Sequence, residues 1–283
     1  MTHAPVATVP GMEKVVAALG RVPETLLWTL YHRAVEARRE DAVLRDPMAV
    51  ELVERIDYPF VTRFGSGEGF SQWQALRARC FDDAVVRFLT GNPAGTVVAL
   101  GEGLETQFWR VDNGRARWLT VDLPEVVELR DRLLPRESRV RALAGSALDE
   151  SWADEVDTAA GVLVTAQGLL MYFAPEDARS LVSTCAERFR GGGLVFDVVP
   201  RWLVERSRRG QLRTGSGYEP PPWHWGFDGE EEKRLRALQN VAELRTLRLP
   251  RGRGVVHGAL LPAAARVPGL RRVMLSVLAA RFA

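Results

Sequence analysis

The pattern of apolar and polar positions divides the chain near residue 96. Before that point, apolar residues recur at the spacing of amphipathic helices in three stretches. The first begins at Pro23-Glu24, the second runs from Pro47 to about Ile56, and the third runs from Trp73 to Leu89. A glycine-rich break at 64–69 separates the second helix from the third, and Gly91-Asn92-Pro93 ends the third. Residues 1–92 are therefore predicted to form a helical N-terminal cap.

After residue 96, short apolar runs rich in β-branched residues alternate with helical segments. The runs cover Thr96–Leu100, Arg117–Val121, Val140–Leu143, Gly161–Ala166 and Leu194–Val198. Helices are predicted at Pro124–Leu134 and Pro175–Phe189. Strands that are apolar throughout are covered on both faces, so this alternation predicts an α/β fold with a doubly wound, mostly parallel, Rossmann-like sheet. Residues 93–283 are expected to form this core, integrated with the cap as one domain.

The pattern changes again after the fifth run. A polar insertion rich in proline and tryptophan is expected at about 200–228, followed by a helix over Glu230–Asn240. Two further strands are predicted at Ala242–Leu249 and Val255–Leu261, joined by a turn that contains two glycines. A short connection of this kind favours an antiparallel pair at one edge of the sheet.

Composition excludes several classes of protein. The chain has 283 residues, 46% of them hydrophobic, and a formal net charge of +2. It has no apolar run of the ~18–20 residues that cross a bilayer, and no secretory signal is predicted. Cys80 and Cys185 lack the spacing of metal ligands, so we expect a cytoplasmic protein with reduced cysteines and no metal. The basic stretch 201–213 lacks interleaved aromatic residues, which favours a solvated face over nucleic-acid binding.

The turn Gly101-Glu102-Gly103 directly follows the first strand of the predicted sheet. Ligands of doubly wound sheets bind beyond the carboxyl ends of the strands, where glycine lets a ligand approach the backbone. The second strand ends at Asp122, a carboxylate placed to accept ribose hydroxyls; the alternative is a surface or capping carboxylate. Thr106 stands where a dinucleotide fingerprint has its third glycine, so a nucleoside cofactor without a pyrophosphate is favoured.

These residues belong to a longer resemblance. The segments Val98–Arg110 and Val121–Val126 resemble the leucine carboxyl methyltransferase family, and within it the bacterial polyketide O-methyltransferases of the tetracenomycin type. Supporting blocks lie at Glu36–Arg39, Arg45–Ala49, Leu76–Asp83, Ala144–Asp149 and Ala166–Tyr172. The similarity runs from about Leu27 to the end. It implies a class I methyltransferase fold with N-terminal helices and a lid, and S-adenosyl-L-methionine as cofactor.

The resemblance also implies cofactor-binding residues. An arginine before the first strand pairs with the methionine carboxylate in this family, and Arg77 matches it, with Arg79 as the second choice. The alternative for Arg77 is an exposed helix residue. Gly101 and Gly103 match the family's glycine turn, and Asp122, followed by Leu123, matches its ribose carboxylate. Ala147 and Leu148 match the adenine contacts, and Gln167 matches the residue after the fourth strand.

Three residues depart from the family pattern. Glu102 stands where a small residue is usual, Glu105 replaces aspartate, and Gln167 replaces glutamate. Glutamine at 167 removes a negative charge that could help to hold the ammonium or sulfonium end of the cofactor. These departures bear on cofactor affinity and methyl transfer rather than on the fold.

The substrate side offers fewer signals. His224, Tyr172 and Gln167 are the candidate catalytic residues, and His32 is better explained as a structural histidine. Within the insertion, Trp223, Trp225 and Phe227 are placed to stack on a flat aromatic substrate or, alternatively, to pin the loop to the protein.

The sequence thus predicts an O-methyltransferase that transfers a methyl group from S-adenosyl-L-methionine to a phenol or carboxylate of a polyketide-like aromatic small molecule. One alternative is a repurposed enzyme that catalyses an addition or coupling on such a molecule. The other is a catalytically silent binding module. Neither nucleic acid nor membrane is an expected partner, and a homodimer is left open.

Overall fold

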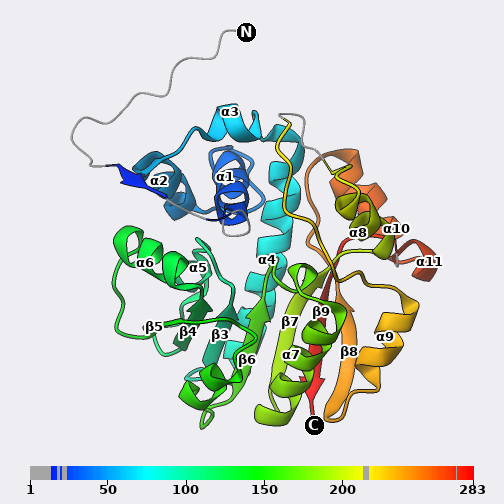
Figure 1. Cartoon of the computed structure of the whole chain (residues 1–283). Helices are drawn as coiled ribbons and strands as arrows, with labels where there is room; N and C mark the ends of the chain where they lie inside the picture. The colour runs from blue at the N-terminus through cyan, green and yellow to red at the C-terminus, as the bar shows by residue number, and fades with distance from the viewer. Residues whose placement is uncertain (1–13, 18–19, 21–23, 213–216, 272) are drawn as a thin grey trace.

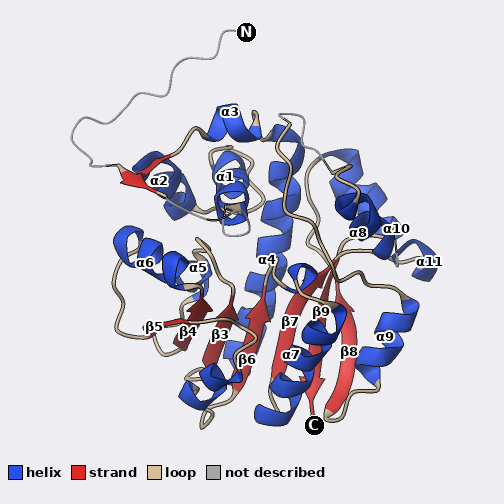
Figure 2. Ribbon diagram, viewed as in Figure 1, coloured by secondary structure: helices blue, strands red, loops and turns tan. Residues whose placement is uncertain are grey.

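The parallel strands of a central sheet point their carboxyl ends toward a group of N-terminal helices (Figure 1). A computed structural model describes residues 14–17, 20, 24–212, 217–271 and 273–283. Helices cover both faces of the sheet (Figure 2). Pro23, part of the predicted start of the first helix, lies outside the described residues.

The sheet contains seven strands in the order β5-β4-β3-β6-β7-β9-β8. Their bounds are β3 Thr96–Leu100, β4 Arg117–Asp122, β5 Val140–Ala144, β6 Val162–Ala166, β7 Gly193–Val198, β8 Val241–Leu247 and β9 Ser276–Phe282. The first five pair in parallel, and β9 pairs antiparallel with both β7 and β8. The predicted parallel strands are confirmed, as is an antiparallel pair at one edge.

Both faces of the central strands are buried, as their continuous apolar character predicts. Along β3, Val98 and Leu100 pack with α7 (Pro175–Arg188) on one face. Val97 and Ala99 pack with α4 (Glu68–Gly91) on the other. Consecutive side chains of a strand point to opposite faces, so each strand is held from both sides and its end is fixed in space.

The partner of β8 differs from the prediction. Val255–Leu261 is helical, a π-helix at Val256–Leu260 continuing into α10 (Leu261–Ala264). Several of its apolar side chains are exposed, among them Val255 at 71%, so this segment does not pack into the sheet. The strand is instead β9, whose Val277, Leu278, Ala280 and Phe282 are buried in the sheet.

The segments that precede the sheet form α1 to α4. Their bounds are α1 Thr25–Ala37, α2 Pro47–Arg55, α3 Phe60–Phe64 and α4 Glu68–Gly91, with a two-stranded parallel ribbon of β1 Val15–Val16 and β2 Ile56–Asp57. Asp46 caps α2 by accepting from the Ala49 amide at 3.0 Å, and Pro47 occupies the first turn. α4 begins five residues before the predicted Trp73, because Gly67, with φ +76°, lets the chain turn into it.

The remaining helices connect or flank the strands. They are α5 Gln107–Val111, α6 Pro124–Leu133, α8 Arg201–Arg208, α9 Gly229–Arg236 and α11 Pro268–Arg271, with 3₁₀ turns at Glu150–Glu155 and Leu170–Tyr172. The predicted helix Glu230–Asn240 therefore ends four residues early, and Asn240, with φ +64°, leads into β8. The insertion after β7 contains α8, which the sequence pattern missed.

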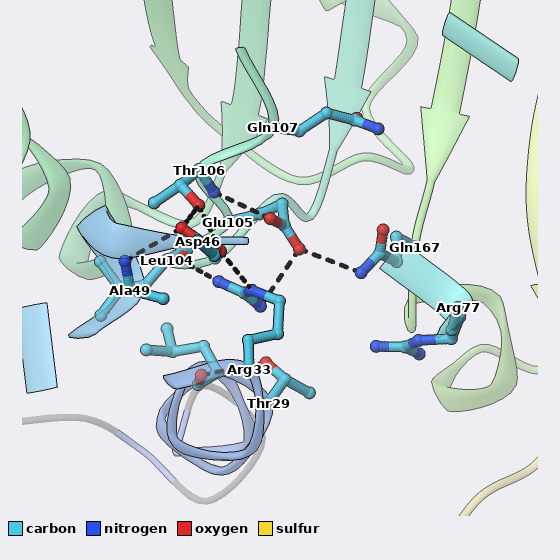
Figure 3. A network of polar contacts seen from close by, with 12 residues as sticks. Thr29, Arg33, Asp46, Ala49, Arg77, Leu104, Glu105, Thr106, Gln107 and Gln167 are labelled. Atoms are coloured by element: carbon cyan, nitrogen blue, oxygen red, sulfur yellow. Dashed lines mark hydrogen bonds and ion pairs between the residues drawn. The ribbon is translucent and has the colours of Figure 1, made fainter. Parts of the chain in front are cut away.

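A buried ionic network joins the first helices to the sheet, and Figure 3 shows its members Arg33, Asp46 and Glu105. Arg110 on α5 contacts Asp46 at 2.9 Å, Asp82 of α4 at 2.8 Å and Glu105 at 2.7 Å. Arg33 of α1 contacts Asp46 at 3.2 Å and Glu105 at 3.1 Å, and donates to the Leu104 carbonyl at 2.7 Å. Three carboxylates and two guanidiniums thus tie α1, α2, α4 and α5 to the loop that follows β3.

Removing one member of this network leaves buried charge without a partner. We expect Arg110→Met to lower the free energy of unfolding by about 3–5 kcal/mol, because Asp82, Asp46 and Glu105 all lose a cation. Urea unfolding at neutral pH measures the change. Arg115→Met, at an exposed position, is the control and is expected to stay within about 0.5 kcal/mol of the parent. Equal effects of the two substitutions would contradict the role given to Arg110.

Candidate active site

A cavity of about 250 Å³ opens at the carboxyl ends of the parallel strands. Its walls come from the segments after β3, β4, β5, β6 and β7, from the start of β9, and from α1 and α4. This is the position where ligands of doubly wound sheets bind. Seven predicted cofactor residues line it: Arg77, Gly101, Gly103, Asp122, Leu123, Ala147 and Gln167.

The glycine turn is tightly packed. Gly101 and Gly103 both have left-handed backbones, with φ +59° and +58°. A Cβ at Gly101 would lie 2.7 Å from Leu169 Cδ1, and one at Gly103 would lie 2.9 Å from Leu26 Cβ. Both conformation and space therefore require glycine here, and α1 closes directly onto the turn through Leu26.

Asp122 shapes the same turn. One carboxylate oxygen accepts from the Gly103 amide at 2.7 Å and the other from the Leu123 amide at 2.8 Å. Burial raises the pKa of Asp122, which these two amides counter. A carboxylate has about four lone-pair sites, so each oxygen keeps one to direct at the cavity. The capping alternative and the ribose hypothesis are thus compatible.

Of the two residues predicted to contact adenine, only one lines the cavity. Ala147 is buried in the cavity wall, and its carbonyl accepts from the Trp152 indole at 3.0 Å. Leu148 is 39% exposed and does not line the cavity. The turn after β5 therefore brings Ala147 to the site and directs Leu148 away from it.

Two of the three departures from the family pattern are paired inside the protein. Glu102 lines the cavity, but its carboxylate is paired with Arg130, 2.9 Å away, and accepts a hydrogen bond from Thr120. Burial raises the pKa of Glu102. Glu105 is also buried, but the adjacent Arg110 and Arg33 outweigh that effect and lower its pKa to about 2. Neither negative charge is left without a cation.

The third departure, Gln167, is hydrogen-bonded to the second, Glu105. The Gln167 amide nitrogen donates to Glu105 at 3.1 Å (Figure 3). Because an amide can donate where a carboxylate cannot, glutamine at 167 suits a neighbouring glutamate at 105. The Gln167 amide oxygen is buried and has no partner among the described residues. A negative charge thus remains beside this position, on Glu105.

Arg77 is buried and not an exposed helix residue. Its Nη1 lies 2.7 Å from Asp197 at the end of β7, and Asp197 also accepts from the Gly168 amide at 2.6 Å. The Arg77 Nε atom has no hydrogen-bond partner within the described part of the chain. Arg79, the second choice, is directed instead to the Val43 carbonyl at 3.2 Å and does not line the cavity.

Of the three predicted catalytic residues, two line the cavity and one does not. Tyr172 and Gln167 line the cavity, and burial raises the pKa of the Tyr172 hydroxyl, so it is protonated at neutral pH. The His224 side chain is exposed and does not line the cavity, because only its backbone amide turns inward, to the Met171 carbonyl at 2.7 Å. The structure therefore removes the geometric basis for His224 as a base.

The aromatic residues of the insertion divide between the two roles considered for them. Trp223 lines the cavity. Trp225 is 1% exposed, packs near Phe196 and donates to Glu231 at 3.1 Å, so it pins the insertion to the core. Phe227 packs against the same core.

Several site residues escaped the sequence analysis because they come from the helical cap or from strand ends without a motif. Arg33, Trp28, Phe70, Trp73, Gln74 and Asp197 all line the cavity. The spacing of Phe70, Trp73, Gln74 and Arg77 places them on one face of α4, which was the available signal.

The model of the leucine carboxyl methyltransferase family matches residues 27–186. The chain is 34% identical over 221 residues to the tetracenomycin polyketide synthesis O-methyltransferase TcmP of Streptomyces glaucescens, covering 77% of this chain and 80% of that protein. It is 30% identical over 221 residues to a putative S-adenosyl-L-methionine-dependent methyltransferase of Saccharopolyspora erythraea, with 72% and 74% covered. The crystal structure of the N-methyltransferase NodS from Bradyrhizobium japonicum, in complex with S-adenosyl-l-homocysteine, aligns with TM-score 0.45 at 14% identity over 93% of this chain and 98% of that one.

The sheet order, the glycine turn and the family match together define a class I S-adenosylmethionine-dependent methyltransferase. S-adenosylmethionine is accordingly its cofactor. The chain belongs to the leucine carboxyl methyltransferase family, as the resemblance implied. Within the described residues, no helix is long and apolar enough to span a membrane, and no group of histidine, cysteine and acidic side chains has the arrangement of a metal site.

His32 provides a test of the packing at this site. It is 3% exposed, and burial lowers its pKa from 6.5 to about 4. The unfolded chain therefore binds the proton more readily between these values, and stability present above pH 6.5 is lost as pH falls through this window. We expect this group alone to remove about 2 kcal/mol between pH 7 and pH 5.

The substitution His32→Phe should abolish that loss, so the difference between urea midpoints at pH 7 and pH 5 should shrink. His224→Phe, at an exposed position, is the control and should leave the difference unchanged. An unaltered pH dependence in His32→Phe would refute the assignment.

Proposed function

We propose that this methyltransferase transfers the methyl group to an oxygen, phenolic or carboxylic, of a polyketide-like aromatic small molecule in secondary metabolism. The observation that carries the proposal is the cavity itself. It joins the glycine turn and Asp122 to a compartment walled by aromatic side chains from α1, α4 and the insertion. The similarity to a polyketide synthesis O-methyltransferase agrees with such a substrate.

The charges around the cavity fit a cationic cofactor. Four carboxylates line it, namely Glu102, Glu105, Asp122 and Asp197, against the two guanidiniums of Arg33 and Arg77. When the buried groups that pair with them are included, Asp46 and Asp82 against Arg110 and Arg130, carboxylates still outnumber guanidiniums. S-adenosylmethionine carries a sulfonium, an ammonium and one carboxylate, so its net positive charge is complementary to this environment.

Individual residues are assigned accordingly. Asp122 would accept the ribose hydroxyls with its remaining lone pairs, and Gly101 and Gly103 would let the nucleoside approach the backbone. Ala147 and Leu123 would contact the adenine. Arg77 Nε, which has no partner among the described residues, would donate to the methionine carboxylate, and the Gln167 amide oxygen, beside Glu105, would accept from the ammonium.

The chemistry asks for positioning more than for acid–base groups. When bound, the cofactor supplies an electrophilic methyl group on a sulfonium. With the cofactor bound, the protein would hold the acceptor oxygen close to that methyl group, which then passes from sulfur to oxygen. A carboxylate acceptor is already deprotonated, whereas a phenol releases its proton to solvent. Tyr172, with a raised pKa, serves as a hydrogen-bond donor to the acceptor rather than as a base.

Incubation with S-adenosylmethionine and a panel of aromatic phenols and aromatic carboxylates tests the proposal. A methyl ether or methyl ester, detected by mass spectrometry together with S-adenosylhomocysteine, is the expected product. Consumption of a polyketide without use of the methyl group would favour the repurposed enzyme. Absence of cofactor binding at millimolar concentration, with no turnover, would favour a silent binding module.

The ribose assignment is tested by Asp122→Asn. Asparagine keeps an acceptor for the Gly103 amide but loses the charge, so the Kd of S-adenosylmethionine should rise about 10- to 100-fold by calorimetry. Asp131→Asn, at an exposed position on α6, is the control and should bind like the parent. An unchanged Kd in the Asp122 variant would overturn the assignment.

A further inference from the structure

The cavity extends beyond the nucleoside side of the site. The strand order places the ends of β3, β4 and β5 at one part of this edge, and the ends of β6 and β7 with the start of β9 at the other. The cavity walls also include Trp28, Phe70, Trp73, Gln74, Tyr172 and Trp223, which we call the acceptor compartment. They come from α1, α4, the turn after β6 and the insertion.

Aromatic packing fixes the shape of this compartment before any ligand enters. The Trp28 and Phe70 rings lie 4.9 Å apart between centroids with planes tilted by 34°. The edge of His32 packs on Trp28 at 4.9 Å and 82°. Rings held in this way present a rigid apolar surface, and a planar ligand loses little conformational freedom on stacking against it.

Three buried polar atoms interrupt this apolar wall, and one of them, Trp223 Nε1, lies beside the Tyr172 hydroxyl. The Trp28 indole Nε1 and the Gln74 amide Oε1 have no hydrogen-bond partner in the part of the chain that the structure describes. Gln74 is only 3% exposed, and both residues line the cavity. Buried polar groups are nearly always paired in folded proteins, so a ligand is expected to supply both partners. The indole can only donate and the amide oxygen can only accept.

The compartment offers no free cation. Arg77 is paired with Asp197 at 2.7 Å, and Arg33 is committed to Asp46, Glu105 and the Leu104 carbonyl. Among the described lining residues these are the only basic side chains. The Arg77 Nε is already assigned to the cofactor, so with S-adenosylhomocysteine bound, whose sulfur is uncharged, a carboxylate on the second ligand would meet Asp197 without a compensating charge.

We infer that the acceptor compartment binds an uncharged, planar phenol that also carries a ketone, and that it discriminates against carboxylates. The ketone oxygen accepts from Trp28 Nε1, a ring hydroxyl donates to Gln74 Oε1, and the rings pack on Phe70 and Trp73. This inference rests on the proposed function and narrows its acceptor from phenol or carboxylate to phenol.

Binding tests it without methyl transfer. In the presence of S-adenosylhomocysteine, calorimetry and tryptophan fluorescence quenching would measure the Kd of 6-acetyl-2-naphthol. The probes 2-naphthol and 2-acetylnaphthalene lack the ketone and the hydroxyl respectively, and 6-hydroxy-2-naphthoate replaces the ketone by a carboxylate. We expect each deletion to raise the Kd about 5- to 10-fold and the carboxylate to raise it further.

Two variants assign the contacts. Trp28→Phe keeps a ring but loses the donor, so it should weaken the probes that carry the ketone and leave 2-naphthol unaffected. Gln74→Leu should weaken the hydroxylated probes and leave 2-acetylnaphthalene unaffected. Both should bind S-adenosylhomocysteine like the parent, which shows that they fold. Trp202→Phe is the control, because Trp202 is 46% exposed and its indole donates to the Val273 carbonyl.

Three results would overturn the inference: no binding of any probe, a carboxylate probe that binds as tightly as the ketone, or variants that weaken all probes equally. Failure of the proposed function has a different signature. Probes that bind in the expected pattern but are never methylated would leave the compartment assignment standing and refute O-methylation of such phenols.

Discussion

The buried pairing of Arg110 and Arg33 with Asp46, Asp82 and Glu105 holds the helical cap on the sheet. Helices cover both faces of the sheet, but the carboxyl ends of its parallel strands would otherwise form an open edge. The network supplies the missing wall by fixing α1, α2 and α4 over that edge. Its members are nearly all side chains with little solvent access, so the attraction is strong where the geometry is satisfied and its loss is costly.

The same network explains how this chain tolerates an unusual set of acidic residues near the cofactor. Glu105 is one methylene longer than the aspartate typical of its family, and it contacts two guanidiniums and the Gln167 amide. Gln167 in turn lacks the charge that glutamate would bring there. The pair therefore keeps one negative charge between the two positions. Glu102 is balanced separately, by Arg130.

Sequence reasoning recovered the parts of this molecule that follow from short, local patterns. Continuous apolar runs located β3 to β7, and the glycine turn followed by Asp122 located the nucleoside side of the site. β9 was missed because Ser-Val-Leu-Ala-Ala-Arg-Phe is apolar enough for a helix or a strand, and only its place between β7 and β8 decides. His224 was favoured for its aromatic neighbours, but the backbone turns its ring outward. Trp28 and Gln74 could not be found, because their distance from the glycine turn depends on how the cap docks.

α4 contributes to four parts of the molecule from a single rigid helix. It carries Gln74 in the acceptor compartment, Arg77 at Asp197, Asp82 in the ionic network and Phe81 in the core under the sheet. Each residue advances about 100° around a helix. Deleting one residue between Arg77 and Asp82 would therefore turn one set of side chains away from its partners while the other stayed in place. An insertion or deletion in this stretch of α4 would therefore separate the site from the network, so its length is set by the site's geometry.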